Sequence, residues 1–400
     1  MKSMSKIDDL IKEMCPDGVE FKELSQLAKI LNGYAFKSEK YSQDGIRVIR
    51  ISDVQKGRLS DKDIKYYPLE HKSEISKYLL SENDLVMSLT GNVGRVAMIT
   101  KSALPAGLNQ RVACVRPGEE ILTRYLFHFF DQDTFEKAAF ESSTGGGQKN
   151  MSTVWLSKFP IPVPPLEVQK EIVRVLDSFT ELEAELEAEL EARKKQYEYY
   201  RNSLMTFDEN TSGVQWKTLE SVCESVSAGG DLPNNYMKGN VQPTKEFPYP
   251  IYSNGTEQNA LYGYSDSYKI DKKAVTISAR GTIGYHAVRG EKFTPIVRLI
   301  TLIPNTKIIT IKFLNYALDI TEIGHSGGSI PQLTVPNVKK ISIPVPTLAI
   351  QERIVSILDK FDALVNDIST GLPAEIEARR KQYEYYRNKL LTFKELERSK

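Results

Sequence analysis

The chain has 400 residues, of which 40% are hydrophobic and 26% charged, so it is long enough for two or three domains with buried cores. Its formal net charge of +1 favours no particular partner, and no apolar run approaches the roughly 18 residues of a membrane span. Three scattered cysteines without a CxxC pair and four isolated histidines argue against a disulfide framework and a metal cluster, and they indicate a cytoplasmic protein.

Residues 1–160 are predicted to form one globular domain. Residues 1–14 are too charged for a secretory signal and are predicted to form a short amphipathic helix. The β-rich runs IRVIRISDV, DLVMSLT and RVACVRP are separated by glycine, proline and asparagine turns, and a helix is predicted over residues 124–140. This pattern is typical of an irregular α/β domain.

Residues 161–210 are predicted to form a long helix that follows a proline-rich lead. The prolines of IPVPP keep the lead extended and prevent the helix from starting earlier. Apolar residues then recur at steps of three and four, from Leu166 through Tyr197 to Leu204, and this stripe needs another helix to cover it. Inside it, ELEAELEAELEAR repeats the tetrapeptide LEAE. We interpret this run as a helical spacer, and a solvated charged helix is the alternative.

Residues 211–400 repeat this plan. The runs YPIYSN, KAVTISA and IVRLITLIP predict strands of a second domain over residues 211–343, with a helix at 311–323, and residues 344–400 predict a second long helix. IPVPTLAIQERIVSILD matches IPVPPLEVQKEIVRVLD of the first half, and GVQWKTL matches GVEFKEL. Gly371 and Pro373 are expected to kink or break the second helix. The chain is therefore a tandem duplication of a unit of about 190 residues.

The octapeptide KQYEYYRN occurs twice without a change, at residues 195–202 and 381–388. Four of its tyrosines continue the apolar stripes and are predicted to pack helix against helix: Tyr197, Tyr200, Tyr383 and Tyr386. A surface that is identical in two otherwise divergent halves is expected to meet the same partner twice. Four further side chains are therefore candidate docking residues for a partner protein: Tyr199, Arg201, Tyr385 and Arg387.

Charge is unevenly distributed along the chain. Residues 20–160 hold 20 Lys and Arg against 17 Asp and Glu, and residues 213–343 hold 14 against 10. The first helix, residues 161–207, holds 6 against 10. Mildly basic domains joined by an acidic helix fit two nucleic-acid-binding parts held apart by a spacer that avoids phosphates.

No residue set in the sequence points to covalent chemistry. PDGVEFKE contains the letters of a metal-dependent nuclease motif, but Asp17 and Glu20 lie on one short segment and the matching GVQWKTL lacks both. The GNVG and GTIG loops are too short for a dinucleotide site, and no phosphate-binding lysine follows them. The serine-rich loops have no neighbouring base to activate a nucleophile. The sequence therefore predicts a protein that positions something rather than an enzyme.

Sequence-specific DNA reading needs Arg, Lys, Asn, Gln and Ser on loops that can reach base edges. Such residues recur on matching loops of both halves with different side chains, as expected for two readers of different sequences. The candidates in the first half are Arg47, Arg50, Ser52, Lys56, Arg58, Asn92, Arg95, Asn109, Gln110, Arg111, Gln148, Lys149 and Asn150. Those in the second half are Ser253, Asn254, Arg280, Thr282, Tyr285, Arg298, Ser326, Ser329 and Gln332.

With these elements the chain resembles the specificity subunit of type I restriction–modification systems. The resemblance rests on the two repeated units, the IPVPP and IPVPT helical tails, the tetrapeptide spacer and the segment EARRKQYEYYRNKLLTF. It implies an α/β (α+β) fold in which two similar target recognition domains are separated by two long antiparallel helices that form a coiled-coil spacer with a pseudo-twofold. It also implies a non-catalytic subunit that reads an asymmetric bipartite target in double-stranded DNA.

The resemblance implies partners as well. These are two modification subunits, which bind S-adenosylmethionine and methylate adenine N6, and restriction subunits that use ATP and Mg²⁺. No cofactor is expected in this chain. Two alternatives stay open: a coiled-coil scaffold that binds no DNA, and a stand-alone DNA-binding regulator. Salt-sensitive, sequence-specific DNA binding would exclude the scaffold, and its dependence on modification subunits would exclude the regulator.

Overall fold

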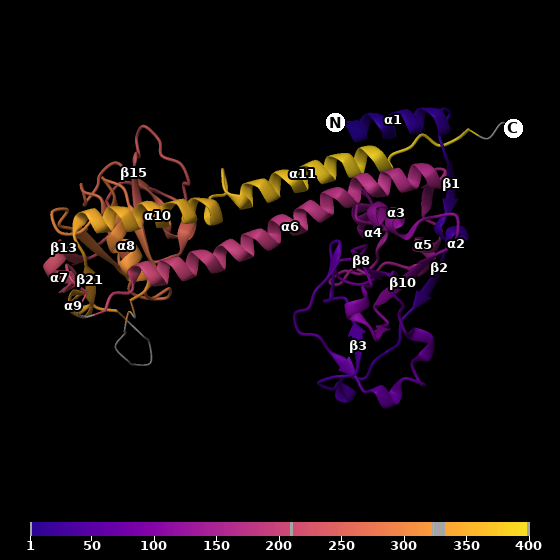
Figure 1. Cartoon of the computed structure of the whole chain (residues 1–400), viewed down its shortest axis with the longest axis horizontal. Coiled ribbons are helices and arrows are strands. Elements are labelled where there is room, and N and C mark those ends of the chain that lie inside the picture. Colours follow the sequence, from indigo (N-terminus) through magenta and orange to yellow (C-terminus); the bar gives the residue numbers. More distant parts are fainter. Residues whose placement is uncertain (1, 209–210, 322, 324–332, 398–400) are drawn as a thin grey trace. The chain divides into compact units, whose positions relative to one another are not determined.

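The computed structural model describes residues 2–208, 211–321, 323 and 333–397 (Figure 1). It divides into two compact units: residues 1–187 together with 375–400, and residues 188–374. Each unit thus combines one globular part with helical segments from both halves of the sequence. We call the globular parts head 1 (residues 1–160) and head 2 (residues 211–343). Among the described residues, no helix is long and apolar enough to cross a membrane.

The first unit contains the whole of head 1. The helices of head 1 are α1 (Lys2–Met14), α2 (Leu24–Leu27), α3 (Thr123–Phe130), α4 (Asp133–Ser142) and α5 (Thr153–Ser157), with 3-10 turns at Ser38–Lys40, Leu69–His71, Ser76–Tyr78 and Lys101–Ala103. Its strands are β1 (Glu20–Glu23), β2 (Ala28–Asn32), β3 (Ile46–Ile49), β4 (Val54–Gln55), β5 (Arg58–Leu59), β6 (Tyr66–Tyr67), β7 (Leu85–Ser88), β8 (Val96–Met98), β9 (Ala106–Leu108), β10 (Val112–Pro117) and β11 (Pro160–Val163).

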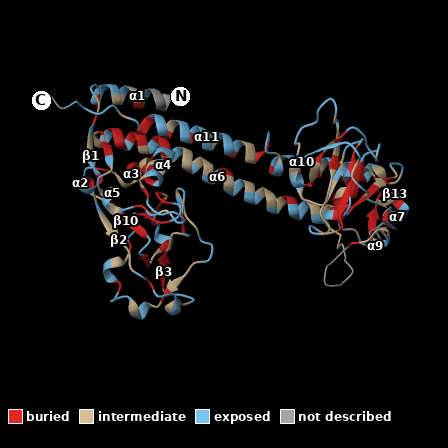
Figure 2. Ribbon diagram, turned by 180° about the vertical axis from the view of Figure 1, so that it is seen from behind, coloured by how far each residue is buried: buried red, intermediate tan, exposed pale blue. Residues whose placement is uncertain are grey.

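A four-stranded antiparallel sheet in the order β2-β10-β7-β8 forms the centre of head 1. Its inner strand β7 is buried along its whole length because both faces are covered. Buried residues are red in Figure 2. A second sheet, β6-β3-β9, pairs β3 with β9 in parallel. The helix predicted over residues 124–140 is instead two helices, α3 and α4, because the extended backbone of Gln132 (φ −70°, ψ 142°) interrupts it.

The second unit repeats this core with a different outer sheet. The helices of head 2 are α7 (Leu219–Val222), α8 (Ile311–Asp319) and α9 (Val335–Lys340), with a 3-10 turn at Glu257–Ala260. Its strands are β12 (Gln215–Thr218), β13 (Cys223–Ala228), β14 (Tyr236–Lys238), β15 (Tyr249–Tyr252), β16 (Leu261–Ser265), β17 (Ala274–Ser278), β18 (His286–Arg289), β19 (Thr294–Pro295), β20 (Leu299–Pro304) and β21 (Ser342–Val345). The central sheet β13-β20-β17-β18 corresponds to β2-β10-β7-β8, whereas the outer sheet β14-β16-β15-β19 gains a strand.

Both proline-rich leads form short edge strands. β11 pairs antiparallel with β1, and β21 pairs antiparallel with β12. Proline is tolerated there because an edge strand has one side without ladder partners. The extended leads that the sequence predicts are therefore confirmed.

A buried glutamine fixes the start of each tail on its head. Gln169 and Gln351 are both fully buried. The Gln169 side chain accepts a hydrogen bond from Leu122 N (2.9 Å) and donates to Pro164 O (2.8 Å). Gln351 makes the matching pair of bonds, accepting from Thr310 N and donating to Pro346 O, both at 2.8 Å. Removing either amide would leave buried main-chain groups without partners, at a cost of about 1–3 kcal/mol for each.

The first tail is one helix and the second is two. α6 (Leu166–Met205) has 40 residues, which corresponds to a length of about 60 Å. The second tail contains α10 (Leu348–Asn366) and α11 (Leu372–Leu391), so the break predicted at Gly371 and Pro373 is confirmed, and one continuous helix over residues 344–400 is not formed. A Cβ on Gly371 would lie 2.5 Å from Ala363 O, so the tight turn requires glycine.

Two of the four octapeptide tyrosines predicted to pack helix against helix stack on the other tail, which confirms the prediction for these two. In the first unit the Tyr386 ring stacks on Phe179 (5.3 Å between centroids), and in the second Tyr200 stacks on Phe361 (5.3 Å). Tyr197 and Tyr383 are buried. Each octapeptide therefore packs against the tail of the other half, and in each case inside one unit.

Candidate nucleic-acid interface

Three of the loops predicted to read DNA come together in head 1. Leu89 N donates to Arg111 O (2.9 Å), Gly91 N donates to Lys149 O (2.9 Å), and Met151 N donates to Leu89 O (2.8 Å). These bonds join the loops at residues 88–95, 108–111 and 143–151. Three loops that are separate in the sequence therefore lie together in the structure. We call them the loop cluster of head 1.

The polar residues of this loop cluster have different roles. Asn109 is buried and its Oδ1 accepts from Arg111 N (3.1 Å). Asn150 accepts from the Thr90 hydroxyl (2.8 Å), and the Lys149 ammonium lies 5.1 Å from the centre of the Phe140 ring. The candidates of this cluster that are exposed are Asn92, Gln110, Arg111, Gln148 and Asn150.

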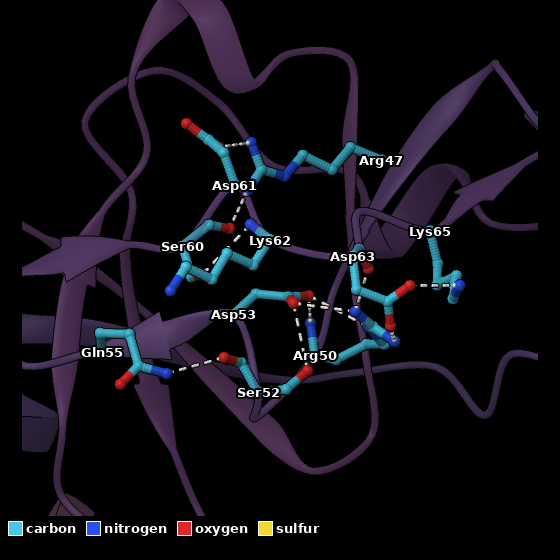
Figure 3. A network of polar contacts seen from close by, with 10 residues as sticks. All are labelled: Arg47, Arg50, Ser52, Asp53, Gln55, Ser60, Asp61, Lys62, Asp63 and Lys65. Carbon is cyan, nitrogen blue, oxygen red and sulfur yellow. Dashed lines mark hydrogen bonds and ion pairs between the residues drawn. The ribbon is translucent and has the colours of Figure 1, made fainter. Parts of the chain in front are cut away.

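Two predicted DNA contacts, Arg47 and Arg50, are engaged inside the protein, as Figure 3 shows. Arg47 is buried, pairs with Asp61 (2.8 Å) and donates to the Ser60 carbonyl (2.8 Å). Its prediction as a base contact is wrong, because a buried guanidinium cannot reach a base edge.

Arg50 binds Asp53 (3.0 Å) and Asp63 (3.5 Å), and the Ser52 hydroxyl donates to Asp53 Oδ1 (3.1 Å). Arg47 and Arg50 therefore tie strand β3 to the loop at residues 60–63. The aspartates that pair with them lie only 3 to 14 positions away in the sequence. These nearby acidic residues could have indicated that the two arginines form ion pairs inside the head.

Lys56 and Arg95 hold the β4–β5 hairpin against helix α4. Lys56 pairs with Asp133 and lies 3.9 Å from Glu136, while Arg95 pairs with Glu136 (3.5 Å) and donates to Gln55 Oε1 (3.2 Å). Arg58, on β5, is exposed.

In head 2 the matching loops are also joined through the main chain. Ala279 N donates to Arg298 O (2.8 Å) and Leu333 N donates to Ala279 O (3.0 Å). Asn254 Nδ2 donates to Arg280 O (3.1 Å), Ser253 donates to Asn254 Oδ1 (3.2 Å), and the Tyr285 hydroxyl accepts from Glu257 N (2.7 Å). Thr282 and Arg298 are exposed. The remaining candidates, Ser326, Ser329 and Gln332, lie outside the described residues.

Head 2 carries a basic and aromatic surface that the sequence reading missed. Lys238 on β14 lies 5.4 Å from the Tyr262 ring centre, and Lys292 lies 5.8 Å from that of Tyr268. Tyr236, on the same strand as Lys238, is exposed. Exposed lysines beside tyrosines can contact phosphates and sugars. The signal was present in YMKGN and LYGYSDSYK, where tyrosines and lysines lie close together in the sequence.

The octapeptide site in the first unit is a buried polar network, and it corrects the prediction for Arg387. Arg387 is 1% exposed and pairs with buried Asp131, the residue that ends α3. Tyr383 lies 2.8 Å from His128 Nδ1, and His128 Nε2 lies 2.6 Å from Asp177 Oδ1. A buried arginine cannot dock a partner, so Arg387 instead closes α11 onto α3.

Electrostatics in this network follow from burial. Burial lowers the pKa of His128, which favours the neutral ring. Because the Asp177 carboxylate can only accept, Nε2 carries the ring proton, and Nδ1 then accepts from the Tyr383 hydroxyl. Burial also raises the pKa of Asp131 to about 6, although the Arg387 cation opposes this shift.

The second unit has a looser version of the same arrangement. Tyr316, at the place of His128, donates to Asp359 (2.8 Å), and Asp319, at the place of Asp131, pairs with His286 (3.1 Å). Arg201 stacks 5.6 Å from the Tyr197 ring centre and is half-buried. The other two docking candidates, Tyr199 and Tyr385, are 69% and 64% exposed, so their assignment stays a prediction.

A family model described as the type I restriction modification DNA specificity domain matches the chain twice, over residues 16–192 and 211–378. A type I specificity subunit of Mycoplasma pneumoniae is 36% identical over 248 residues, which are 59% of this chain and 73% of the relative. A type I restriction enzyme specificity subunit of Haemophilus influenzae is 36% identical over 304 residues (71% and 76%), and one of Escherichia coli is 36% identical over 272 residues (60% and 65%).

Two solved structures share the fold. The S subunit of a type I restriction–modification system from M. genitalium matches with a TM-score of 0.57 at 16% identity, over 94% of this chain and 96% of that one. A chain from a study of complex assembly in the type I R-M system matches with a TM-score of 0.59 at 16% identity, over 94% and 98%.

Proposed function

The chain belongs to the type I restriction–modification DNA specificity family, and on this premise we propose that its two heads read the two halves of an asymmetric, bipartite DNA target. The chain is the DNA specificity subunit of such a system and acts without catalysis of its own. Each head takes one half-site, and the helical tails set the length of the unread gap between the half-sites.

The observation that carries this proposal is a common scaffold with different tips. The loops at residues 88–95 and 278–285 share two main-chain bonds. In the first, Gly94 N donates to Ser88 O and Gly284 N donates to Ser278 O, both at 3.0 Å. In the second, Ser88 N donates to Arg95 O (2.9 Å) and Ser278 N donates to Tyr285 O (2.8 Å). The exposed residue between those anchors differs, however, being Asn92 in head 1 and Thr282 in head 2. One backbone frame that presents different donors and acceptors suits two half-sites of different sequence.

A genome-wide map of the modified base tests this proposal. In cells that contain this chain and its modification subunits, we expect N6-methyladenine in an asymmetric motif made of two short specific parts and a fixed gap. Exchanging head 2 for that of another family member should change one part of the motif and leave the other. A continuous palindromic motif would contradict the two-head reading.

The exposed octapeptide tyrosines support a proposal about partners. Tyr199 lies in the second unit and Tyr385 in the first, and each packs edge-on against the next tyrosine of its octapeptide, with ring centroids 5.5 Å and 5.2 Å apart. We assign these two equal surfaces to two modification subunits, which bind S-adenosylmethionine and methylate adenine N6. Restriction subunits that use ATP and Mg²⁺ complete the complex.

Replacing one exposed tyrosine should prevent the binding of one of the two modification subunits. We expect Tyr385→Ala or Tyr199→Ala to shift the reconstituted complex from two modification subunits to one, because a well-packed aromatic anchor contributes much of the energy of an interface. The mass of the complex, measured by light scattering at micromolar concentration, reports this directly. The adjacent exposed glutamates provide matched controls, Glu384→Ala and Glu198→Ala. A double tyrosine variant that still binds two subunits would refute the assignment.

A further inference from the structure

One turn is held by the same pattern of main-chain hydrogen bonds in both heads. In head 1 it spans residues 108–112 and in head 2 residues 295–299. The bonds that hold it in head 1 are Tyr34 N to Leu108 O (2.7 Å), Gln110 N to Tyr34 O (2.9 Å), Asn109 N to Ile49 O (3.2 Å), Val112 N to Asn109 O (2.9 Å) and Leu89 N to Arg111 O (2.9 Å). Their counterparts in head 2 are Gly230 N to Pro295 O (3.1 Å), Val297 N to Gly230 O (3.0 Å), Ile296 N to Tyr252 O (2.9 Å), Leu299 N to Ile296 O (3.2 Å) and Ala279 N to Arg298 O (2.8 Å).

A glycine supports the turn from behind in each head. A Cβ on Gly33 would lie 2.1 Å from Asn109 O, and a Cβ on Gly229 would lie 2.3 Å from Ile296 O. At these distances no side chain fits, so both heads keep the close approach of two backbones. The turn is therefore a rigid platform whose position depends on main-chain groups and not on its own side chains.

Only the arginine is the same in the two turns. The turn of head 1 reads Leu-Asn-Gln-Arg-Val and that of head 2 reads Pro-Ile-Val-Arg-Leu. The neighbouring exposed position changes from a polar Gln110 to an apolar Val297, which shows that the platform accepts different chemistry there. Arg298 is kept although its backbone has φ +80°, a region that disfavours residues other than glycine. No packing requirement explains an exposed arginine at a strained position.

Both arginines are exposed, and neither has an ion-pair partner among the described residues. In this respect they differ from Arg47, Arg50 and Arg95 of head 1, whose charges are neutralised by nearby carboxylates. An exposed, unpaired guanidinium on a rigid turn is well suited to bind an anion, since little conformational freedom of the backbone is lost on binding.

We propose that Arg111 and Arg298 bind equivalent backbone phosphates in the two half-sites, and that they position each head on the DNA without reading its sequence. This inference rests on the proposed function. A side chain common to two readers of different sequences cannot supply the difference between them, whereas a phosphate is present at the same place in every sequence. The turn then fixes the register of each head, and the variable loops beside it read the bases.

The test uses the full chain in complex with its modification subunits. DNA binding is measured by fluorescence anisotropy over a range of KCl concentrations, on the mapped target and on a scrambled duplex. Wild type is compared with Arg111→Gln, Arg298→Gln and the double variant. The matched controls, Gln110→Ala and Val297→Ala, change the exposed neighbour in the same two turns.

Each single arginine variant should make the negative slope of the log binding constant against log [KCl] about one unit shallower, and the double variant about two units shallower, because one phosphate contact releases about 0.9 counterions. Affinity for target and scrambled DNA should fall by the same factor, and the methylated motif should stay unchanged. The control variants should keep the wild-type slope.

Unchanged slopes in both single variants would overturn the inference, as would a motif that loosens at one base, which would make the arginine a base reader. If the wild-type complex showed no preference for its mapped target, the proposed function itself would fail, and this result is separate from the variant comparison.

Discussion

Replacing Arg387 with methionine is expected to destabilise the first unit by about 3–5 kcal/mol. The substitution removes the cation that pairs with Asp131 and leaves the buried carboxylate without its ion-pair partner. Methionine fills most of the volume of the arginine stem, so the lost ion pair and not a cavity dominates the effect. Asp131→Asn combined with Arg387→Met removes both charges and should recover a large part of the loss.

The loss should also depend on pH. The pKa of Asp131 is already raised to about 6 by burial, and removing the Arg387 cation raises it further. Above pH 6 the folded variant keeps a proton on Asp131 that the unfolded chain, with an ordinary Asp pKa, does not bind. The free energy of unfolding of the variant therefore falls relative to wild type as the pH rises from about 6 toward the higher pKa of the variant. We expect a larger difference in unfolding free energy at pH 8 than at pH 5.5.

The two tryptophans allow each unit to be followed separately. Trp155 lies in the first unit, with its ring 5.0 Å from that of Phe159, and Trp216 lies in the second. In a Trp216→Phe background, urea unfolding monitored by fluorescence reports the first unit alone. Arg201→Met is the matched control in the second unit and is measured in a Trp155→Phe background, in which Trp216 reports that unit. Because Arg201 stacks on Tyr197 without a buried ion pair, this variant should cost less than about 1 kcal/mol. Equal effects of Arg387→Met and Arg201→Met would refute this account.

Deleting one LEAE from residues 182–189 should shorten the preferred gap in the DNA target by about one or two base pairs. Four residues of helix correspond to about 6 Å, and one base-pair step to about 3.4 Å. The deletion turns the rest of α6 by about 40°, which keeps its apolar stripe near the covered side. Because the tetrapeptides are identical, either copy can be deleted with the same result.

Methylation of a set of duplexes with graded gaps, by the chain with its modification subunits, measures this preference. The control keeps the length and changes two exposed residues of the same run, Ala184→Gln and Ala188→Gln, and should leave the preferred gap as in wild type. A deletion variant that prefers the original gap as strongly as wild type would mean that this helix does not set the spacing.

The large-scale plan of this molecule could be predicted because it depends on short-range patterns. The apolar stripe of α6 has helical periodicity, Gly371 and Pro373 break the second tail, and the octapeptide tyrosines continue the stripes. Each of these features is contained within a few turns of chain. The pairing of β1 with β11 was less accessible, since it joins segments about 140 residues apart and neither strand exceeds four residues.

The individual roles of charged residues could not be predicted in the same way. Arg47 and Arg111 look alike in sequence, yet one is buried beside Asp61 and the other is exposed. Arg387 and Arg201 stand in identical octapeptides, yet only the first meets a free carboxylate, because His286 engages Asp319 in the second unit. Asp61 lies only 14 positions from Arg47, whereas Asp131 lies 256 positions from Arg387, in a segment that only the fold brings near.

The buried contact of Asp131 with Arg387 also sets an order in time. The two residues are 256 positions apart in one chain, so head 1 leaves the ribosome long before the helix that completes its polar network. At about 5–20 residues per second the delay is about 13–50 s. During that interval Asp131 and His128 lack Arg387 and Tyr383, so the half of the protein that is made first is the half that is finished last.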